Sequence, residues 1–354
     1  MAKPKVRIYH AVDESGDSYR RLEKAGAEAI WEGGRWDAHI KGARPEDLIL
    51  DADTVAVAGV ANRTLRINDQ SFASAPDLRL VAYYSNGYDN VDLDLATQQG
   101  ILVTHSPTES NWGGVAEGTF AAILCLLKKL REKDRTVKAG GWRDPSLFGT
   151  YLGSRLSDSY GGITIGIIGL GRIGSRIADL FAPWRVTLVG YDPHVEDAKF
   201  VHHNVRSVDL ETLLTKSDVI TLHCDLNEET RNIISTGAID KMKPGAVVVN
   251  AARGPCVDTD ALVDALLQDK IAGAALDAMT QEPPDPQSPL LGLEDKVLLS
   301  PHMVSANRGG GLVPAIPWVE EAVLAALRGT VPNYVVNSEA LPLWQERFGG
   351  KPLI

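Results

Sequence analysis

Residues 163–174 read ITIGIIGLGRIG, and this stretch decides the fold. The first six residues are mostly apolar, as in a buried strand, and the next six have the pattern G-x-G-x-x-G. Such a turn joins a strand to a helix whose free N–H groups and partial positive charge favour a phosphate. Gly169 permits the tight turn, Gly171 leaves room for a pyrophosphate, and Gly174 lets the helix approach the strand. The stretch therefore predicts a dinucleotide-binding turn.

An acidic residue follows this turn at the spacing expected for dinucleotide binding. The apolar segment 186–191 reads as the next strand and ends in Asp192, 18 residues after Gly174. A carboxylate there accepts hydrogen bonds from the ribose hydroxyl groups and repels a 2′-phosphate. No arginine follows Asp192 directly, so the sequence favours NAD over NADP. The alternative is a glycine turn in an unrelated α/β sheet, with Asp192 a solvated strand end.

Strand-like and helical segments alternate along the chain on both sides of the turn. This alternation predicts parallel strands joined by helical crossovers. A long helix is expected from Val115 to Lys138, followed by an irregular connector over 142–161. The other expected strands are 6–10, 54–59, 78–84, 101–104, 163–168, 186–191, 219–224, 246–250, 272–276 and 297–300. The other expected helices are 16–26, 67–75, 91–99, 172–182, 208–216, 235–242, 258–268 and 317–328.

Composition narrows the class of protein. The chain has 354 residues, which suits two domains, and its hydrophobic content of 44% is normal for a globular protein. The net charge of −10 and the lack of a long basic run argue against a nucleic-acid partner. Its three cysteines fit no metal spacing, so neither a metal site nor a disulfide is expected. No signal peptide or membrane span is recognised, and a cytoplasmic location is expected.

Three further motifs follow the glycine turn in order. They are NAARGPCVD at 250–258, LDAMTQEP at 276–283 and SPH at 300–302. Together with the turn, their order and spacing resemble the D-isomer-specific 2-hydroxyacid dehydrogenase family. The resemblance covers about residues 78–337 and is strongest from 162 to 302.

The resemblance implies catalytic roles. Arg253 resembles the arginine that grips the substrate carboxylate and polarises its carbonyl group, His302 the general acid/base, and Glu282 the carboxylate paired with it. Asp277 looks like the residue that contacts the nicotinamide end of the cofactor. The loop Ser85-Asn86-Gly87 aligns with a loop whose backbone N–H groups bind the substrate carboxylate.

Two sets of binding residues follow from these motifs. The expected cofactor contacts are Gly169, Gly171, Arg172, Ile173, Gly174, Asp192, Cys224, Ala251, Arg253, Asp277 and His302. The expected substrate contacts are Ser85, Asn86, Gly87, Arg253 and His302.

General chemistry supports the catalytic roles independently. Reduction of a 2-oxo acid places negative charge on the carbonyl oxygen, which a fixed guanidinium such as that of Arg253 can stabilise. Histidine titrates near neutral pH, and an adjacent glutamate such as Glu282 favours the protonated form of His302. Taken singly, each residue has an ordinary interpretation, as a surface ion-pair partner, a loop acid or a turn residue.

The resemblance also implies the architecture. The predicted class is α/β, with two Rossmann-like doubly wound domains, parallel sheets and a cleft between them. Residues 1–108 plus 303–354 form a discontinuous substrate-binding (catalytic) domain, and residues 109–302 form the NAD-binding Rossmann domain. The chain crosses between them near 109–114 and near 303–311. The long helix after Val115 is expected to contribute to a homodimer formed through the NAD domains.

The chain departs from the family pattern at several positions. Ser85 stands where the substrate loop often has a glycine. Gly118 replaces a common histidine, at the position of a contact with the cofactor amide. His105 and His223 are interpreted as structural residues near strand ends.

Competing functions remain open at this stage. Phosphite and formate dehydrogenases share the predicted fold, but the formate enzymes pair their histidine with a glutamine, where this chain has Glu282. The motifs leave phosphite open. An NAD(H)-sensing corepressor or scaffold of the same fold is an alternative of a different class. The leading hypothesis is an NAD-dependent oxidoreductase that interconverts a 2-oxo acid and a D-2-hydroxy acid.

Overall fold

A computed structural model describes the chain in four segments, residues 3–31, 46–61, 65–308 and 311–354. The chain divides into two compact units. The first comprises Met1–Asn111 with Asn307–Ile354, and the second comprises Trp112–Ala306. These divisions come three and four residues after the predicted boundaries. Residues 309 and 310, in the predicted second crossing, lie outside the described residues.

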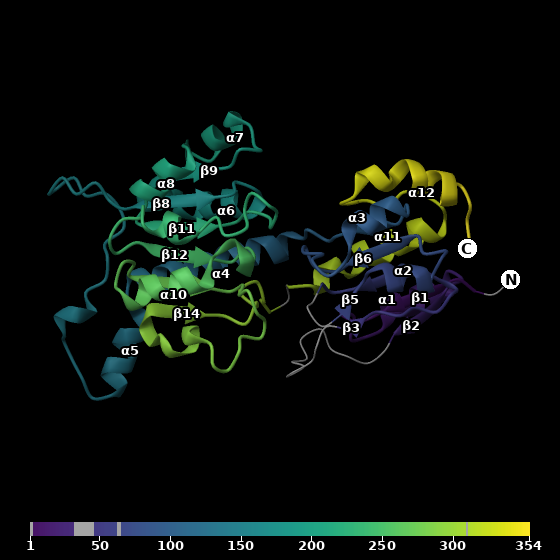
Figure 1. The fold of residues 1–354 in the computed structure, drawn as a ribbon, viewed down its shortest axis with the longest axis horizontal. Coiled ribbons are helices and arrows are strands. Elements are labelled where there is room, and N and C mark those ends of the chain that lie inside the picture. Colours follow the sequence, from purple (N-terminus) through teal and green to yellow (C-terminus); the bar gives the residue numbers. More distant parts are fainter. Residues whose placement is uncertain (1–2, 32–45, 62–64, 309–310) are drawn as a thin grey trace. The chain divides into compact units, whose positions relative to one another are not determined.

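The second unit is built on a seven-stranded parallel sheet with the order β10-β9-β8-β11-β12-β13-β14 (Figure 1). From β8 the chain continues to β9 and β10 on one side of that strand. It then crosses back, and β11 to β14 follow on the other side of β8. Ligands bind in α/β sheets at such a switch point. The strands are β8 (Thr164–Ile168), β9 (Thr187–Tyr191), β10 (Arg206–Ser207), β11 (Val219–Leu222), β12 (Val247–Asn250), β13 (Gly273–Leu276) and β14 (Val297–Leu299).

Helices cover both faces of this sheet because successive side chains of a strand point to opposite faces. Ile165 and Ile167 pack in a core with α4 and α6, whereas Ile220 and Val248 belong to a second core with α8, α9 and α10. The strands are therefore apolar on both faces, as parallel strands usually are. The helices are α4 (Glu109–Leu127), α6 (Arg172–Phe181), α8 (Leu210–Lys216), α9 (Thr236–Ile239) and α10 (Thr259–Leu267).

The first unit has a five-stranded parallel sheet with the order β2-β1-β4-β6-β7. Helices α1, α11 and α12 pack in one core of this unit, and α2 and α3 in another. The strands are β1 (Lys5–Ile8), β2 (Glu28–Trp31), β4 (Thr54–Gly59), β6 (Leu80–Tyr83) and β7 (Leu102–Thr104), with a separate pair β3 (Glu46–Asp47) and β5 (Leu65–Arg66). The helices are α1 (Asp17–Lys24), α2 (Asp69–Ser74), α3 (Leu93–Gln98), α11 (Ile316–Leu327) and α12 (Leu341–Phe348). The predicted α/β class with Rossmann-like parallel sheets is confirmed.

Two buried side chains fix the returning C-terminal segment in the first unit. The Nε1 of Trp344 donates to the backbone oxygen of Arg79 at 2.9 Å. The side chain of Asn337 accepts from the N–H of Val103 and donates to the oxygen of Ile101. The return segment thus completes this unit, which explains why the unit is discontinuous in sequence.

The predicted long helix over 115–138 was wrong in its extent and continuity. Two helices occupy the region, α4 and α5 (Leu130–Lys138), because Lys129 between them has a left-handed conformation with φ 51° and ψ 47°. Helix α4 also begins at Glu109, so residues 109–114, predicted as a crossing, form its first turns. No helix in the described part of the chain is both long and apolar enough to span a bilayer.

Several short elements were not predicted. Strand β10 has two residues, too few for a recognisable hydrophobic pattern, and β2 has a single buried residue. Helix α7 (Asp197–His202) buries only Phe200, and α12 follows the irregular segment after α11. These elements are stabilised by packing on the sheet rather than by local pattern.

Candidate active site

The glycine turn follows β8 at the switch point of the second unit. Gly169 has φ +88°, and a Cβ on it would lie 2.7 Å from backbone atoms of His223 and Cys224. A Cβ on Gly174 would lie 2.0 Å from the backbone oxygen of Gly169. A Cβ on Gly171 would meet nothing within 4 Å. Two of the glycines are therefore needed for packing, and the third faces open space.

That open space adjoins the start of α6. Gly171 is the N-cap residue and provides no side-chain cap, so the first N–H groups of the helix, beginning with Arg172 and Ile173, have no side-chain acceptor there. Uncapped N–H groups and the helix dipole favour an anion. The residues present therefore fit the pyrophosphate of a dinucleotide.

Asp192, the residue predicted to bind the ribose, is hydrogen-bonded to the same turn. Asp192 follows β9, and its Oδ2 accepts from the N–H of Leu170 at 2.8 Å, while its Oδ1 accepts from the N–H of His194 at 3.0 Å. Each carboxylate oxygen has capacity for a further hydrogen bond. The structure thus brings Asp192 to the glycine turn and holds it in a fixed orientation.

Two other predicted cofactor residues follow neighbouring strands. Ala251 comes directly after β12, and Cys224 lies two residues after β11. A hydrogen bond with the thiol of Cys256 and burial both raise the pKa of Cys224. Cys224 is therefore a neutral thiol rather than a nucleophile.

The three predicted catalytic residues follow three adjacent strands. Arg253 comes after β12, Glu282 after β13 and His302 after β14, and these strands are hydrogen-bonded neighbours. Carboxyl ends of parallel strands lie along one edge of a sheet, where α/β proteins bind ligands. The pKa of His302 is raised, mainly by its hydrogen bond to Glu282, and the positive charge of Arg253 opposes this shift.

Buried Asn250 positions Arg253. Its Oδ1 accepts from the N–H of Ala252 at 3.0 Å, and its Nδ2 donates to the oxygen of Arg253 at 2.9 Å. Gly254 fits the following turn closely, because a Cβ there would lie 2.1 Å from the carbonyl carbon of Met279. The loop that carries Arg253 is therefore packed directly on the loop that leads to Glu282.

Glu282 and His302 form a hydrogen-bonded pair. The Nδ1 of His302 lies 2.9 Å from the Oε2 of Glu282, and the Oε1 of Glu282 accepts from the N–H of Met279 at 2.7 Å. The glutamate side chain is 16% exposed and that of the histidine 48%. The hydrogen bond to Glu282 is the main cause that raises the pKa of His302, against the effect of burial. The pair therefore presents the Nε2 of a readily protonated imidazole.

Asp277 fixes the backbone around His302. Its Oδ1 accepts from the N–H groups of Met303 at 2.9 Å and Val304 at 3.0 Å, and its backbone oxygen accepts from the N–H of His302 at 3.1 Å. His302 has φ +56°, a conformation that costs free energy in a non-glycine residue. The carboxylate predicted to contact the nicotinamide thus also holds the histidine segment in place.

Gly118 permits a close approach to the same segment. A Cβ on this residue of α4 would lie 2.3 Å from a methyl carbon of Val304 and 2.5 Å from its backbone oxygen. The space that a side chain at 118 would need is therefore occupied by a methyl group and the backbone oxygen of Val304, two residues after His302.

The predicted substrate loop belongs to the first unit. Ser85-Asn86-Gly87 follows β6, and all three residues are partly exposed. The Ser85 hydroxyl accepts from the N–H of Ala61 at 3.1 Å and donates to the oxygen of Gly87 at 2.8 Å. The serine that departs from the family pattern therefore stabilises the loop.

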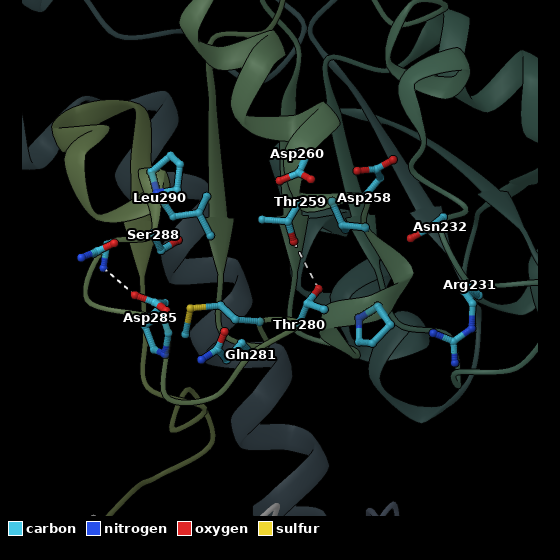
Figure 2. A pocket seen from close by; sticks show the side chains of 16 residues that line it. Arg231, Asn232, Asp258, Thr259, Asp260, Thr280, Gln281, Asp285, Ser288 and Leu290 are labelled. Carbon is cyan, nitrogen blue, oxygen red and sulfur yellow. Dashed lines mark hydrogen bonds between the residues drawn. The ribbon is translucent and has the colours of Figure 1, made fainter. Parts of the chain in front are cut away.

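A cavity of about 680 Å³ opens beside the site loops of the second unit (Figure 2). It lies between the loop after β12 and the loop after β13, where the hydroxyl oxygens of Thr259 and Thr280 are 3.2 Å apart. Arg253, Glu282 and His302 are not among the described residues that line it. Other polar residues around it in Figure 2 are Arg231, Asp258, Asp260, Gln281 and Asp285.

Sequence reasoning did not identify three residues that shape the site. Asn250 and Gly254 flank Arg253 within a quoted motif, but Asn250 acts through hydrogen bonds inside its own turn, and Gly254 through its close contact with Met279. Gly118 was noted only as a departure from the family. Motif membership could have marked Asn250 and Gly254 as candidates, whereas nothing in the sequence indicates the contact with Val304.

Comparisons with known proteins agree with this geometry. The family model described as D-isomer specific 2-hydroxyacid dehydrogenase, NAD binding domain, matches residues 120–304. The chain belongs to this family. The predicted cofactor, NAD, is thereby confirmed.

Relatives cover the chain to different extents. A glyoxylate reductase of Thermofilum pendens is 35% identical over 350 residues, which are 96% of each chain. A D-3-phosphoglycerate dehydrogenase of Archaeoglobus fulgidus is 36% identical over 294 residues, but these span only 54% of that relative. A crystal structure of a D-lactate dehydrogenase of Aquifex aeolicus complexed with NAD and lactic acid has a TM-score of 0.74 and 27% identity, covering 90% of this chain and 94% of that one.

The glycine turn yields a paired prediction. In Gly171→Ala the new methyl group meets no protein atom and φ is −71°, so the melting temperature should stay the same or rise slightly, whereas NADH binding should weaken at least ~10-fold. In Gly174→Ala the methyl group clashes with Gly169, and stability should fall by about 1–3 kcal/mol. Calorimetry and NADH fluorescence titration measure both effects. Unchanged NADH affinity in Gly171→Ala would contradict the assigned phosphate site.

The pairing of Glu282 with His302 predicts a titration shift. Glu282→Gln removes the negative charge that raises the pKa of His302, so this pKa should fall. Histidine NMR titration with ¹³C labelling measures the change. Asp179→Asn is the matched control, because it breaks another histidine–carboxylate contact, with His203 at 2.8 Å, and should leave the titration of His302 unchanged.

Proposed function

We propose that this protein is an NAD-dependent oxidoreductase that reduces a small 2-oxo acid to a D-2-hydroxy acid and catalyses the reverse oxidation. The observation that carries the proposal is the 2.9 Å pair of His302 and Glu282, which lies on the sheet that bears the dinucleotide turn. Membership of a 2-hydroxyacid dehydrogenase family supports it.

Arg253 is the proposed electrophilic residue. When bound, the reduced nicotinamide supplies a hydride to C2 of the substrate. The charge that develops on the carbonyl oxygen is stabilised by the guanidinium, which also holds the substrate carboxylate through a second N–H. Asn250 and Gly254 keep the arginine loop in place for this role.

His302 is the proposed general acid. Because Nδ1 faces the carboxylate of Glu282, Nδ1 carries a hydrogen, and the proton available to the substrate is on Nε2. Nε2–H donates this proton to the oxygen as the 2-hydroxy acid forms, and neutral Nε2 accepts it in the reverse reaction. Reduction should therefore decline as the pH rises through the pKa of His302, and a raised pKa extends the active range upward.

The substrate and cofactor preferences complete the proposal. The N–H groups of the loop Ser85-Asn86-Gly87 bind the substrate carboxylate. Asp192 accepts hydrogen bonds from the ribose and disfavours a 2′-phosphate, so NADH is preferred to NADPH. The relative named glyoxylate reductase, which matches 96% of this chain, favours a small substrate of the glyoxylate type. A cytoplasmic location stays a prediction, and three free cysteines are compatible with it.

A substrate panel tests the function. Oxidation of NADH, followed by absorbance, should occur with at least one of glyoxylate, hydroxypyruvate and pyruvate, and more slowly with NADPH. His302→Ala should lower kcat by about 10²–10⁴. Arg253→Ala should raise KM and lower kcat by about 10²–10³. Tight NADH binding without turnover of any 2-oxo acid would favour a cofactor-sensing scaffold instead, and phosphite-dependent reduction of NAD would favour a phosphite dehydrogenase.

We also propose a homodimer formed through the second unit. Helix α5 buries none of its residues in the chain, and the connector after it exposes Trp142, Phe148 and Leu156 by 71%, 78% and 94%. Exposed apolar side chains that form a contiguous patch are typical of an interface between subunits, and we propose that these three form such a patch in the dimer. These three side chains are called the connector surface.

Mass measurement tests the dimer. Sedimentation or light scattering should give twice the chain mass of 38.2 kDa. Changing all three residues of the connector surface to serine should yield monomers. Val201→Ser is the control, because Val201 is 78% exposed on α7 and should not affect assembly. A monomeric wild-type protein at micromolar concentration would refute the proposal.

A further inference from the structure

The loop Ser85-Asn86-Gly87 is held through all three of its carbonyl oxygens. The N–H of Ser106 donates to the oxygen of Ser85 at 3.1 Å, and the Ser85 hydroxyl donates to the oxygen of Gly87 at 2.8 Å. The Nδ1 of His105 lies 3.0 Å from the oxygen of Asn86. A carbonyl oxygen only accepts hydrogen bonds, so this Nδ1 carries the hydrogen.

These contacts orient the N–H groups of the loop. In a planar trans peptide, the C=O of one residue and the N–H of the next point in opposite directions. The hydrogen bond to the oxygen of Asn86 therefore fixes the direction of the N–H of Gly87. In the same way, the hydrogen bond to the oxygen of Ser85 fixes the direction of the N–H of Asn86. Within the described residues, neither N–H donates to a protein acceptor. The loop thus keeps two donors oriented and available for a ligand.

Of the three groups that hold the loop's carbonyl oxygens, only the imidazole of His105 is a side chain from outside the loop. It follows β7 directly, and its backbone N–H donates to the oxygen of Tyr334 at 3.3 Å. The ring of Tyr88 contacts its imidazole edge-on, with ring centroids 6.0 Å apart. Backbone and ring are therefore both supported, which places Nδ1 accurately under the loop.

The surroundings of His105 indicate what its loss would do. The residue is partly buried and borders a cavity of about 270 Å³ in the first unit, which Trp318 and Glu321 also line. Removal of the imidazole would enlarge this cavity and admit water. Mobile water would then replace a fixed donor, and the peptide between Asn86 and Gly87 could rotate.

We propose that His105 is a positioning residue for substrate recognition, whose Nδ1–H holds the Asn86–Gly87 peptide so that the N–H of Gly87 points to the carboxylate of the 2-oxo acid. The inference rests on the proposed function, in which this loop binds that carboxylate. It gives His105 a role beyond support of a strand end. His105 acts through Gly87 and takes no part in proton transfer.

Kinetics and binding together test this role. His105→Leu fills space without a donor, whereas His105→Asn restores a side-chain N–H near the same place. Loss of a well-placed N–H to a carboxylate weakens binding by about tenfold. We expect His105→Leu to raise both the KM of the 2-oxo acid and the Kd of oxamate, measured by calorimetry at saturating NADH, by about this factor. The values for His105→Asn should return close to wild type, and kcat should change far less than KM.

Controls separate this role from a general structural one. In His105→Leu and His105→Asn, the Kd of NADH measured without substrate should equal that of the wild type, because the loop belongs to the unit that lacks the dinucleotide turn. Asn333→Ala changes an exposed residue that lines the same cavity and should leave every parameter unchanged. If His105→Leu does not fold, His105→Gln replaces it, since its longer side chain moves the donor away from Asn86.

The outcomes distinguish the two proposals. If the wild type reduces a 2-oxo acid while His105→Asn and His105→Leu have equal KM and equal oxamate Kd, the proposed role of His105 is wrong and the proposed function stands. If the wild type neither reduces a 2-oxo acid nor binds oxamate, the proposed function fails and the role of His105 falls with it.

Discussion

Parallel hydrogen bonding between β12, β13 and β14 is the constraint on which the candidate site depends. Because the strands run in one direction and are neighbours, residues far apart in sequence reach the same edge of the sheet. Arg253, Glu282 and His302 each lie a few residues beyond a strand end, so the register of the sheet sets their separation. The order of β8 and β11 places the phosphate-binding turn at the switch point of the same sheet.

Hydrogen bonds rather than close packing give the site its precision. The side chain of His302 is about half exposed, so apolar neighbours alone do not fix its orientation. Both oxygens of Glu282 are engaged, one with the imidazole and one with a backbone N–H, and Asp277 holds the backbone that follows His302. A partly buried carboxylate that lacked these partners would be costly, because desolvation favours its neutral form. The hydrogen bond of Glu282 to the imidazole is the main cause that keeps the pKa of His302 raised.

Most of the second unit could be predicted from the sequence because its patterns are local. An apolar strand, a glycine turn and an acid after the next strand are separated by fixed distances along the chain. The left-handed break at Lys129 could not be predicted, because lysine is an ordinary helix former and no glycine or proline marks the position. Asn250 and His105 were missed as positioning residues for a similar reason. His105 contacts the oxygen of Asn86, 19 residues away, whereas Asn250 contacts the turn that directly follows it, and neither hydrogen bond leaves a periodic signal in the sequence.

Gly118 and the segment after His302 are structurally coupled. A side chain at 118 would overlap Val304, and the N–H of Val304 is held by the carboxylate that also fixes Met303. Any larger residue at 118 would therefore push on a backbone whose displacement reaches the imidazole within two residues. With glycine at 118, a methyl group and the backbone oxygen of Val304 occupy the space beside α4. The physical consequence is that the identity of residue 118 and the path of residues 302–304 cannot vary independently in this protein.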